Sequence, residues 1–462
     1  MVEATPRDTY LKLYQAMDKV AYYNKEREFA FGISMYSNKI QNYEFMNNEN
    51  AKGWYTSDGV SYLYNDDLSH YSDDYWATVD PYKLAGITET NEARKKGSGM
   101  TTMDHSFVGS TALGNKYGTV AMDFQNWNKT LTAKKSWFIL GDRIVFLGSD
   151  IKNSTDNEAY TVVDNRKVQR ESRNRSASKN DYSVVADGKE VPVSDADSKM
   201  QVKDLLLKSQ NTQMNIGYKF LEPTTVNVKK ENRKGTWKDI NEGQSDEEVE
   251  NSFISIVQRH DATNNKYAYV LYPNRSDKEF EEEKNNDDIQ VVENSEKTQA
   301  VFDKKNQIYG VVKYEDSELT LEDGLVLKEK GIYTIKKEGN KLDIAFLNPE
   351  DPSAGLSALN TGKYELQNST EPTVENKIRY YTYLVKKQTE EETTQEQTQE
   401  QTQQSSSELT TESRNTEDSK DSNTRKEETL PATGAKNFEV YTLLGILLLT
   451  ISLIFSKKRL QK

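Results

Sequence analysis

The chain has 462 residues, 34% of them hydrophobic, and it carries a formal net charge of −13 at pH 7. A chain of this length is too long for one compact core, so we expect two or more domains. The acidic balance argues against general nucleic-acid binding, and the absence of cysteine excludes disulfides, cysteine metal sites and thiol nucleophiles. His70, His105 and His260 are too far apart in the sequence to form a zinc motif, so we expect no metal site.

The first regular pattern runs from Thr9 to Tyr22. Apolar residues recur there at roughly helical spacing, and Pro6 and Asp8 precede them, which predicts a helix belonging to a larger domain. Residues 1–20 lack the basic region and apolar core of a secretory signal peptide. We therefore expect the chain to start inside a longer protein.

From Thr119 onward the pattern changes to β-strands. Residues 137–147 predict a hairpin that turns at Gly141-Asp142, and residues 182–193 predict a second hairpin around Asp187-Gly188. Further strands are predicted at residues 215–221, 267–272, 308–314, 331–336 and 341–346. Helical patterns are rare in this stretch, which indicates packed antiparallel sheets.

Residues 388–429 have a different composition, dominated by Gln, Thr, Glu and Ser. Leu409 is the only sizeable apolar residue, and there are no aromatic residues. Such a segment cannot bury enough apolar surface to offset the entropy lost on ordering. It predicts a solvated stalk.

The C-terminal end has three parts in order: an LPxTG motif, an apolar run over residues 440–455 and a basic tail over residues 457–459. The apolar run is near the lower length limit for a membrane-spanning helix, and the basic tail would hold it on the cytoplasmic side. A sortase would cleave after Thr433 and join it to peptidoglycan. The alternative, a permanent membrane helix, explains fewer of these features. The motif consists of Leu430, Pro431, Ala432, Thr433 and Gly434.

A series of short motifs also follows in order along the chain. They are residues 42–44 (NYE), 47–50 (NNEN), 53–59 (GWYTSDG), 62–65 (YLYN), 71–82 (YSDDYWATVDPY), 122–124 (MDF), 127–128 (WN), 131–138 (LTAKKSWF) and 235–241 (GTWKDIN). Each motif alone is weak, but their joint order is specific. Together they resemble the hyaluronate lyases, in the polysaccharide lyase family that includes chondroitin AC and xanthan lyases, over about residues 6–365.

The resemblance implies a mainly β fold. An antiparallel β-supersandwich and a small C-terminal β-sandwich would follow the last helix and long loops of an α/α-toroid domain. On this basis we expect five parts: the end of the toroid (1–115), the supersandwich (116–285), the C-terminal β-domain (286–370), the disordered stalk (371–429) and the sortase signal (430–462). The boundary between the second and third parts is weak and falls near the acidic segment 277–288.

The resemblance also implies β-elimination of hyaluronan or a related glycosaminoglycan, with no cofactor. An Asn and nearby cations would stabilise the enolate-like charge, and a Tyr/His pair would move the protons. In the family these residues lie on the toroid, and none of the three histidines here has a matching context. We expect none of that catalytic set in this chain, which would be inactive alone. His70 is expected to be a loop residue bonded to its neighbours.

Four residues are candidates for the substrate cleft. Lys39 stands where the resemblance places an arginine; lysine keeps the charge but loses the planar fork that grips a carboxylate. Glu49 and Asn50 could orient this cation or contact sugar hydroxyls, or they could simply form turns. Trp54, with Tyr55 and Trp76, could stack on sugar rings, although such dense aromatics are more often core.

A basic run over residues 166–175 could attract an anionic glycan, although a solvated loop is the favoured interpretation. The leading hypothesis is a wall-anchored, monomeric lyase whose partners are a hyaluronan-type glycan, sortase and peptidoglycan. The rival is a non-catalytic surface module that holds glycan as an adhesin does. A degenerate product with no role is the third interpretation.

Overall fold

The computed structural model describes residues 7–65, 67, 69–168, 181–210, 215–322, 324–357, 360–361, 364–368 and 372–387. They belong to one compact unit, residues 1–393. The sortase motif, the apolar run and basic tail, and the polar tract 388–429 lie outside the described residues. Among the residues that are described, no helix is long and apolar enough to cross a membrane.

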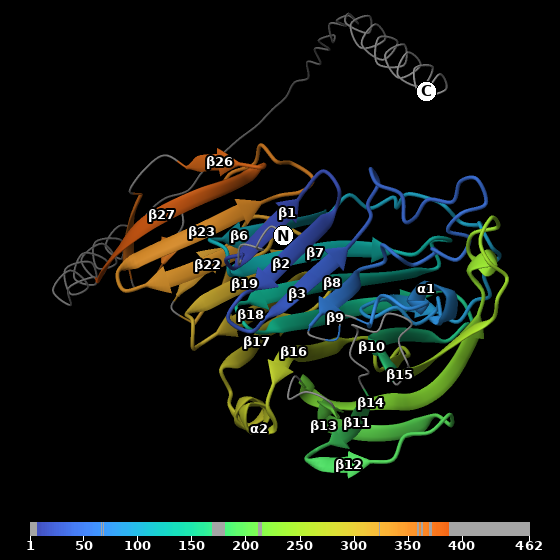
Figure 1. Ribbon diagram of the computed structural model, residues 1–462. Helices are drawn as coiled ribbons and strands as arrows, with labels where there is room; N and C mark the ends of the chain where they lie inside the picture. Colours follow the sequence, from blue (N-terminus) through green and yellow to red (C-terminus); the bar gives the residue numbers. More distant parts are fainter. Residues whose placement is uncertain are drawn as a thin grey trace, which may run out of the picture. The chain divides into compact units, whose positions relative to one another are not determined.

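The first sheet is antiparallel, with the order β1-β2-β3-β4 (Figure 1, blue). The helix expected over Thr9 to Tyr22 is therefore wrong. The same residues pair as a hairpin, with Tyr14 opposite Lys19, and Asp18 takes a left-handed φ of 53° that ends any helix. The strands are β1 (Tyr10–Tyr14), β2 (Lys19–Asn24), β3 (Phe29–Ser34) and β4 (Val60–Tyr64).

In the described part of residues 7–115 the α-helical content is the short α1 (Tyr75–Thr78), so strands and loops dominate this range rather than a toroid helix. Alternate residues of the first sheet, such as Val20, Tyr22 and Phe31, join the same hydrophobic core as residues of the following strands. Burial in β2 alternates with the period of two that a strand requires, not with the helical period of 3.6.

The large sheet contains the central strands in the order β12-β11-β13-β14-β16-β9-β8-β7-β6, with β10, β15 and β5 joined to it. Both predicted hairpins are confirmed, and the left-handed Gly141 and Asp187 lie in their turns. Its strands are β5 (Thr88–Thr90), β6 (Val108–Leu113), β7 (Tyr117–Gln125), β8 (Leu131–Leu140), β9 (Ile144–Asn153), β10 (Ala159–Val168), β11 (Tyr182–Ala186), β12 (Lys189–Val191), β13 (Ser198–Ser209), β14 (Asn215–Gly235), β15 (Val249–His260) and β16 (Tyr267–Arg275).

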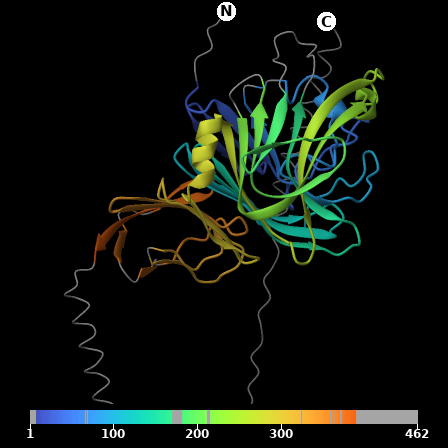
Figure 2. The same cartoon turned by 90° about the horizontal axis from the view of Figure 1, so that it is seen from below.

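A helix, α2 (Asp277–Asn285), occupies most of the acidic segment where a boundary was expected. Ser276 and Glu279 form a capping box at its start, a signal that was present in the sequence. Figures 1 and 2 show α2 close to β16 and to the strands that follow it. Phe280 on α2 packs in one cluster with Phe138 of the large sheet and Ile308 of the next one.

The C-terminal sheet has the order β17-β18-β19-β22-β23-β27-β25, with β26 paired to β27, and a small sheet has the order β20-β21-β24. The strands predicted at 308–314, 331–336 and 341–346 are confirmed. The strands are β17 (Ile289–Asn294), β18 (Thr298–Asp303), β19 (Ile308–Lys313), β20 (Leu319–Thr320), β21 (Leu325–Leu327), β22 (Gly331–Glu338), β23 (Lys341–Leu347), β24 (Asn360–Thr361), β25 (Tyr364–Asn368), β26 (Thr373–Glu375) and β27 (Ile378–Lys387).

The stalk expected from residue 371 is wrong for residues 373–387. Ile378, Tyr381 and Tyr383 of β27 are buried, and this strand pairs with β23. The apolar residues at 378–384 therefore extend the sheet beyond the expected domain end.

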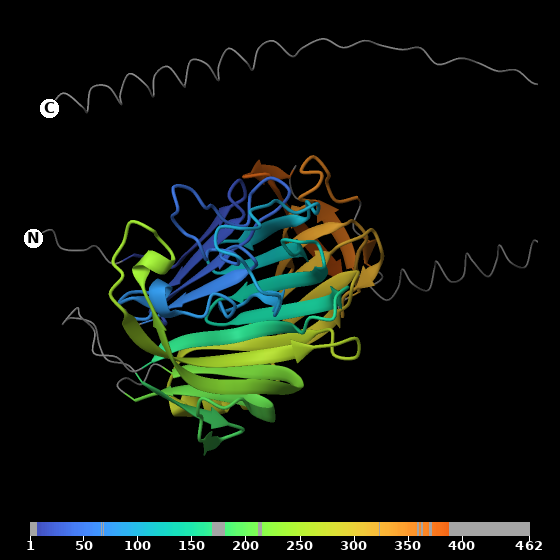
Figure 3. The same ribbon diagram turned by 90° about the vertical axis from the view of Figure 1, so that its right-hand side faces the viewer.

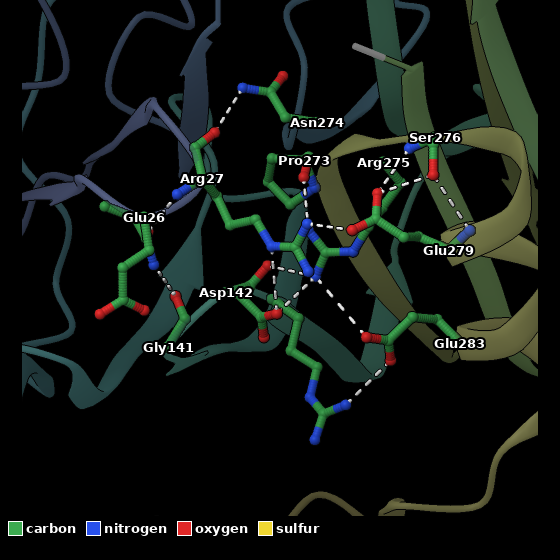
Figure 4. A network of polar contacts seen from close by, with 12 residues as sticks. Glu26, Arg27, Gly141, Asp142, Pro273, Asn274, Arg275, Ser276, Glu279 and Glu283 are labelled. Atoms are coloured by element: carbon green, nitrogen blue, oxygen red, sulfur yellow. Dashed lines mark hydrogen bonds and ion pairs between the residues drawn. The ribbon is translucent and has the colours of Figure 1, made fainter. Parts of the chain in front are cut away.

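An arginine cluster joins the β2–β3 turn, the β8–β9 turn, the end of β16 and α2 (Figure 4). Arg27 Nη1 lies 2.6 Å from Glu279 Oε1, and Arg275 Nη2 lies 2.9 Å from Asp142 Oδ2. Arg143 extends it into the C-terminal sheet, because its Nη2 lies 2.9 Å from Asp303 Oδ1 and both side chains are fully buried. A buried charge needs such a partner.

We predict that Asp303→Asn lowers the free energy of unfolding by about 3 kcal/mol, because it leaves Arg143 buried with less compensation. Glu283, 3.2 Å from Arg143, keeps the loss from being larger. Urea unfolding measures this loss in the free energy of unfolding. Lys304→Gln, which removes the exposed pair with Asp287, is the control and should cost less than about 1 kcal/mol. Equal effects of the two substitutions would contradict the assignment.

Candidate functional site

The candidate site is built from the loop between β3 and β4, which contacts the loop after β5, from the α1 segment between β4 and β5, and from the 3-10 helix η1 (Trp237–Asp239) after β14. Asn42, fully buried, ties the first two loops together. Its Nδ2 donates to the carbonyl of Gly99 (3.1 Å), and its Oδ1 accepts from the N–H of Thr101 (3.0 Å). These loops therefore hold one another in place without regular secondary structure.

The motif at 47–50 forms a tight turn. Asn47, Asn48 and Asn50 have φ values of 53°, 58° and 62°. Asparagine tolerates this left-handed region better than most residues, so the turn-forming interpretation of Asn50 is confirmed. The N–H of Asn50 donates to Asn241 Oδ1 (2.8 Å), and Glu49 forms an isolated β-bridge with Asn241. Their contact with sugar remains a prediction.

A pocket of about 350 Å³ opens beside this turn. That volume is at the lower end of the range for small-molecule sites, ~300–1,000 Å³. Trp76 and Trp237 contribute aromatic surface, and Asn50, Lys52 and Asn241 contribute polar groups. Figures 1 and 3 show η1 next to α1, the two elements that bring these indoles together. The lining is Asn50, Lys52, Gly53, Thr56, Tyr62, Trp76, Ala77, Val79, Pro81, Leu84, Trp237, Ile240 and Asn241.

Of the four residues proposed for the cleft, Asn50 alone lines this pocket. Trp237, Lys52 and Asn241 were not singled out, although Trp237 and Asn241 lie in the motif at 235–241. The distance of Trp237 and Asn241 in sequence from residues 42–59 hid the connection, and Lys52 lies between two of the motifs. Within the described ranges, no group of three or more His, Asp or Glu could hold a metal ion.

Trp54 is 3% exposed, so its proposed stacking on a sugar ring is wrong and the core interpretation holds. Its Nε1 donates to the carbonyl of Lys95 (3.1 Å). The Arg94 guanidinium lies 5.5 Å from the centre of the Trp54 ring, 5.1 Å from that of Tyr55 and 4.0 Å from that of Trp127. This cation–π cluster stabilises the loop that contributes residues to the pocket.

Lys39 is exposed on the loop after β3, where its N–H donates to Ser37 Oγ (3.1 Å). It forms no ion pair within 4 Å among the described residues, yet it is close enough to lower the pKa of Asp18. Burial is the larger influence and raises that pKa overall. The predicted role of Lys39 beside the sugar path stays a prediction.

The basic run does not present its first two cations to solvent. Arg166 and Lys167 are buried at the end of β10. Arg166 Nε lies 3.3 Å from Asp164 Oδ2, and Lys167 Nζ donates to the carbonyl of Ser72 (2.6 Å). Both the glycan-attracting and the solvated-loop interpretations are wrong for these two residues. Arg170, Arg173 and Arg175 lie outside the described residues.

His70 and His260 are buried. The backbone N–H of His70 donates to the carbonyl of its neighbour Asp67 (3.3 Å), as expected, and its Nδ1 accepts from the N–H of Lys167 (3.2 Å), which is distant in sequence. Burial lowers the pKa of His70 well below its usual value. His260 bonds Thr161 Oγ1 (2.7 Å), and burial lowers its pKa to about 4. Neither imidazole is placed to exchange protons with a ligand in the pocket.

His105 is partly exposed, and its Nδ1 lies 3.1 Å from Asp123 Oδ1. The hydrogen bond to Asp123 raises the pKa of His105, with burial opposing it. Lys134 pairs with the other carboxylate oxygen of Asp123 at 2.7 Å.

Comparison with known proteins identifies the family. The model of the polysaccharide lyase family 8 super-sandwich domain matches residues 9–284, and that of the C-terminal beta-sandwich domain matches residues 290–356. The chain belongs to polysaccharide lyase family 8. The LPXTG cell wall anchor motif matches residues 422–459, so the family 8 chain carries the anchor of surface proteins linked to peptidoglycan.

Among its relatives is the hyaluronate lyase of Staphylococcus aureus, 37% identical over 372 residues, which are 79% of this chain and 44% of that protein. The xanthan lyase of Bacillus sp. is 30% identical over 368 residues, 79% of this chain and 38% of that protein. The Paenibacillus xanthan lyase structure superimposes with a TM-score of 0.69 at 29% identity, covering 82% of this chain and 37% of that one. The chain thus spans less than half the length of these relatives.

We predict distinct titrations for the histidines by NMR. His105 should titrate above its ordinary value of 6.5 and His260 near 4. Because the folded pKa of His105 is raised, its pairing with Asp123 stabilises the fold fully below about pH 6.5 and is lost as pH rises through the raised value. Asp123→Asn should return His105 toward 6.5. A His105 titration unchanged by this substitution would contradict the pairing.

Proposed function

We propose that this chain supplies the glycan-binding β-sheet part of a wall-anchored lyase acting on uronic-acid-containing glycosaminoglycans such as hyaluronan. The observation that carries the proposal is the pocket between Trp76 and Trp237, on loops that contain the family motifs. Its two indoles offer apolar faces to sugar rings. Asn50, Asn241 and Lys52 supply hydrogen-bond donors at its rim, and the lysine charge suits a uronate carboxylate.

β-Elimination requires a base for the uronate C5 proton, an acid for the leaving O4 and stabilisation of the intermediate charge. The pocket lining contains no histidine, and its one tyrosine, Tyr62, has a pKa raised by burial. A raised pKa disfavours the phenolate that would act as a base. We therefore propose that the described part binds and orients the glycan and does not by itself catalyse elimination.

The second candidate function is a surface module that holds glycan without cutting it. The burial of His70 and His260 favours it, because neither ring can reach a bound sugar. Both functions place the same glycan in the same pocket. They differ in whether unsaturated uronate forms when the chain acts within a complete lyase.

We predict that Trp237→Ala weakens binding of hyaluronan oligosaccharides by about tenfold, because it removes one aromatic wall of the pocket. Calorimetry measures the dissociation constant. Asp246→Asn, an exposed change on the same hairpin and outside the pocket lining, is the control and should leave binding unchanged.

In the same samples the ultraviolet absorbance of unsaturated uronate should not rise above that of a heat-denatured control. A steady rise would mean that this chain carries the elimination chemistry, and binding unaffected by Trp237→Ala would mean that the pocket is not the glycan site.

Sortase and peptidoglycan are the partners implied by the anchor motif at residues 430–434. We predict that Thr433→Ala moves a secreted form of the chain from the wall fraction to the membrane or the medium. The reason is that the acyl group transferred to peptidoglycan belongs to Thr433. Immunoblots of the cell fractions measure the change, with Thr429→Ala as the matched control. An unchanged wall fraction would refute the assignment.

A further inference from the structure

Asp58 ends the loop segment that contains the pocket residues Gly53 and Thr56, and its carboxyl group is fully buried. Among the described residues, no backbone N–H and no hydroxyl, amide or cationic side chain donates to either carboxyl oxygen. Nor does Asp58 form an ion pair within 4 Å with any described cation. A carboxylate in such surroundings would be very costly.

The partner of Asp58 is a second buried acid, Glu89 on β5. The two side chains are close enough for a hydrogen bond between them, and no other donor reaches Asp58 Oδ1, Asp58 Oδ2 or Glu89 Oε1 among the described residues. Glu89 Oε2 also accepts from the N–H of Thr90 (3.1 Å) and from Asn126 Nδ2 (3.3 Å), whereas Oε1 has no such donor. An ionised carboxyl group is only an acceptor, so a bond between two carboxyl groups requires a proton on one of them.

Lys135 on β8 is the nearest group that could take this proton instead. Its Nζ donates to the carbonyls of Asp58 (2.7 Å) and Gly86 (2.8 Å). These two hydrogen bonds satisfy both N–H groups of a neutral Lys135 amine. A charged Lys135 ammonium would have a third N–H group without an acceptor. The rings of Phe124 and Trp137, centred 5.3 and 5.6 Å away, would offer an ammonium cation–π attraction but no oxygen acceptor. Burial also lowers the pKa of Lys135 to about 7.

The other charged and titratable groups facing the pair come from three elements. Arg94, on the loop after β5, supplies one positive charge against the single negative charge of a singly protonated pair. Tyr36 after β3, Tyr55 beside Asp58 and Tyr160 on β10 are neutral, because burial raises the pKa of each phenol. With Lys135 neutral, the cluster is balanced.

We propose that Asp58 and Glu89 share one proton, and that this acid pair is a positioning device that fixes the pocket loop to strand β5. The second part rests on the proposed function, since it assumes that the loop contacts glycan. Loss of the proton would place two negative charges in contact inside the core and push the loop away from the strand.

The sign of the pH effect follows from the direction of the shift. Burial, followed by the charge of Glu89, raises the pKa of Asp58 well above its usual value. A raised carboxyl pKa gives stability that is fully present below the ordinary value and lost as pH rises through the folded value. The pocket loop should therefore loosen as pH rises above the ordinary carboxyl value of 3.8, and not as pH falls below it.

The test compares the full-length chain with Asp58→Asn and Glu89→Gln. Either amide can donate to the remaining carboxylate without a shared proton, so each variant should lose the infrared carbonyl band of a protonated carboxylic acid that the wild type shows at neutral pH. Asp123→Asn, which replaces an acid paired with Lys134, is the matched control and should keep the band. Thermal unfolding should show a steeper loss of stability with rising pH in the wild type than in Asp58→Asn.

If the wild-type spectrum shows no carboxylic-acid band that the two substitutions remove, the shared proton is wrong. If Asp58→Asn does not fold, the spectrum of Glu89→Gln alone decides this question. If the stability of the wild type and of the variant falls equally with rising pH, the positioning role is wrong. Binding of hyaluronan oligosaccharides, followed in parallel, should weaken with rising pH in the wild type only. If the wild type binds none at any pH, the proposed function fails, while the spectra and unfolding still decide the acid pair.

Discussion

The packing of the first sheet against the large sheet is the contact on which the rest of this structure depends. Phe31 of β3 meets Phe146 of β9 edge to face, with ring centres 6.0 Å apart, inside a core that both sheets line. Burial of this apolar surface is the main favourable term in folding. The pocket loops leave β3 and return at β4, so the position of this sheet sets where they lie. Moving the first sheet would move Asn50 away from Asn241, because the two residues lie on loops that leave different sheets.

Buried charge is the second constraint. Buried charged groups are stabilised by buried partners rather than by solvent. Arg143 has Asp303, and Arg94 lies among three aromatic rings. Asp58 has another acid. Pairs and clusters of this kind contribute little net stability, but leaving one member alone is costly. They therefore fix which segments must meet, which is how loops without regular structure keep a defined shape. The pocket between Trp76 and Trp237 depends on these contacts, because its lining comes from segments up to 191 residues apart in the chain.

Sequence patterns predicted the hairpins because each one needs only local information, namely alternating apolar residues and a turn that accepts positive φ. They failed for residues 9–22, where apolar spacing fits a helix and a strand pair equally well and the pairing partner decides. Helix α2 was missed although Ser276 and Glu279 announced its start. For the site, the motif order predicted the family, and Asn50 is the one cleft candidate that lines the pocket. It did not distinguish Trp54, which is core, from Trp237, which lines the pocket, since both stand in aromatic motifs.

By itself the sequence determined the antiparallel strands, the family and the wall anchor, because turn chemistry, strand alternation and the order of short motifs are all written along the chain. Tertiary structure alone decided which side chains face solvent. Arg166 and Lys167 look like a solvated basic run in the sequence, yet β10 carries them into the interior. Asp58 and Glu89 look like ordinary surface acids until the fold presses them together. Burial and pairing depend on strands distant in sequence, and that distance is what a linear pattern cannot measure.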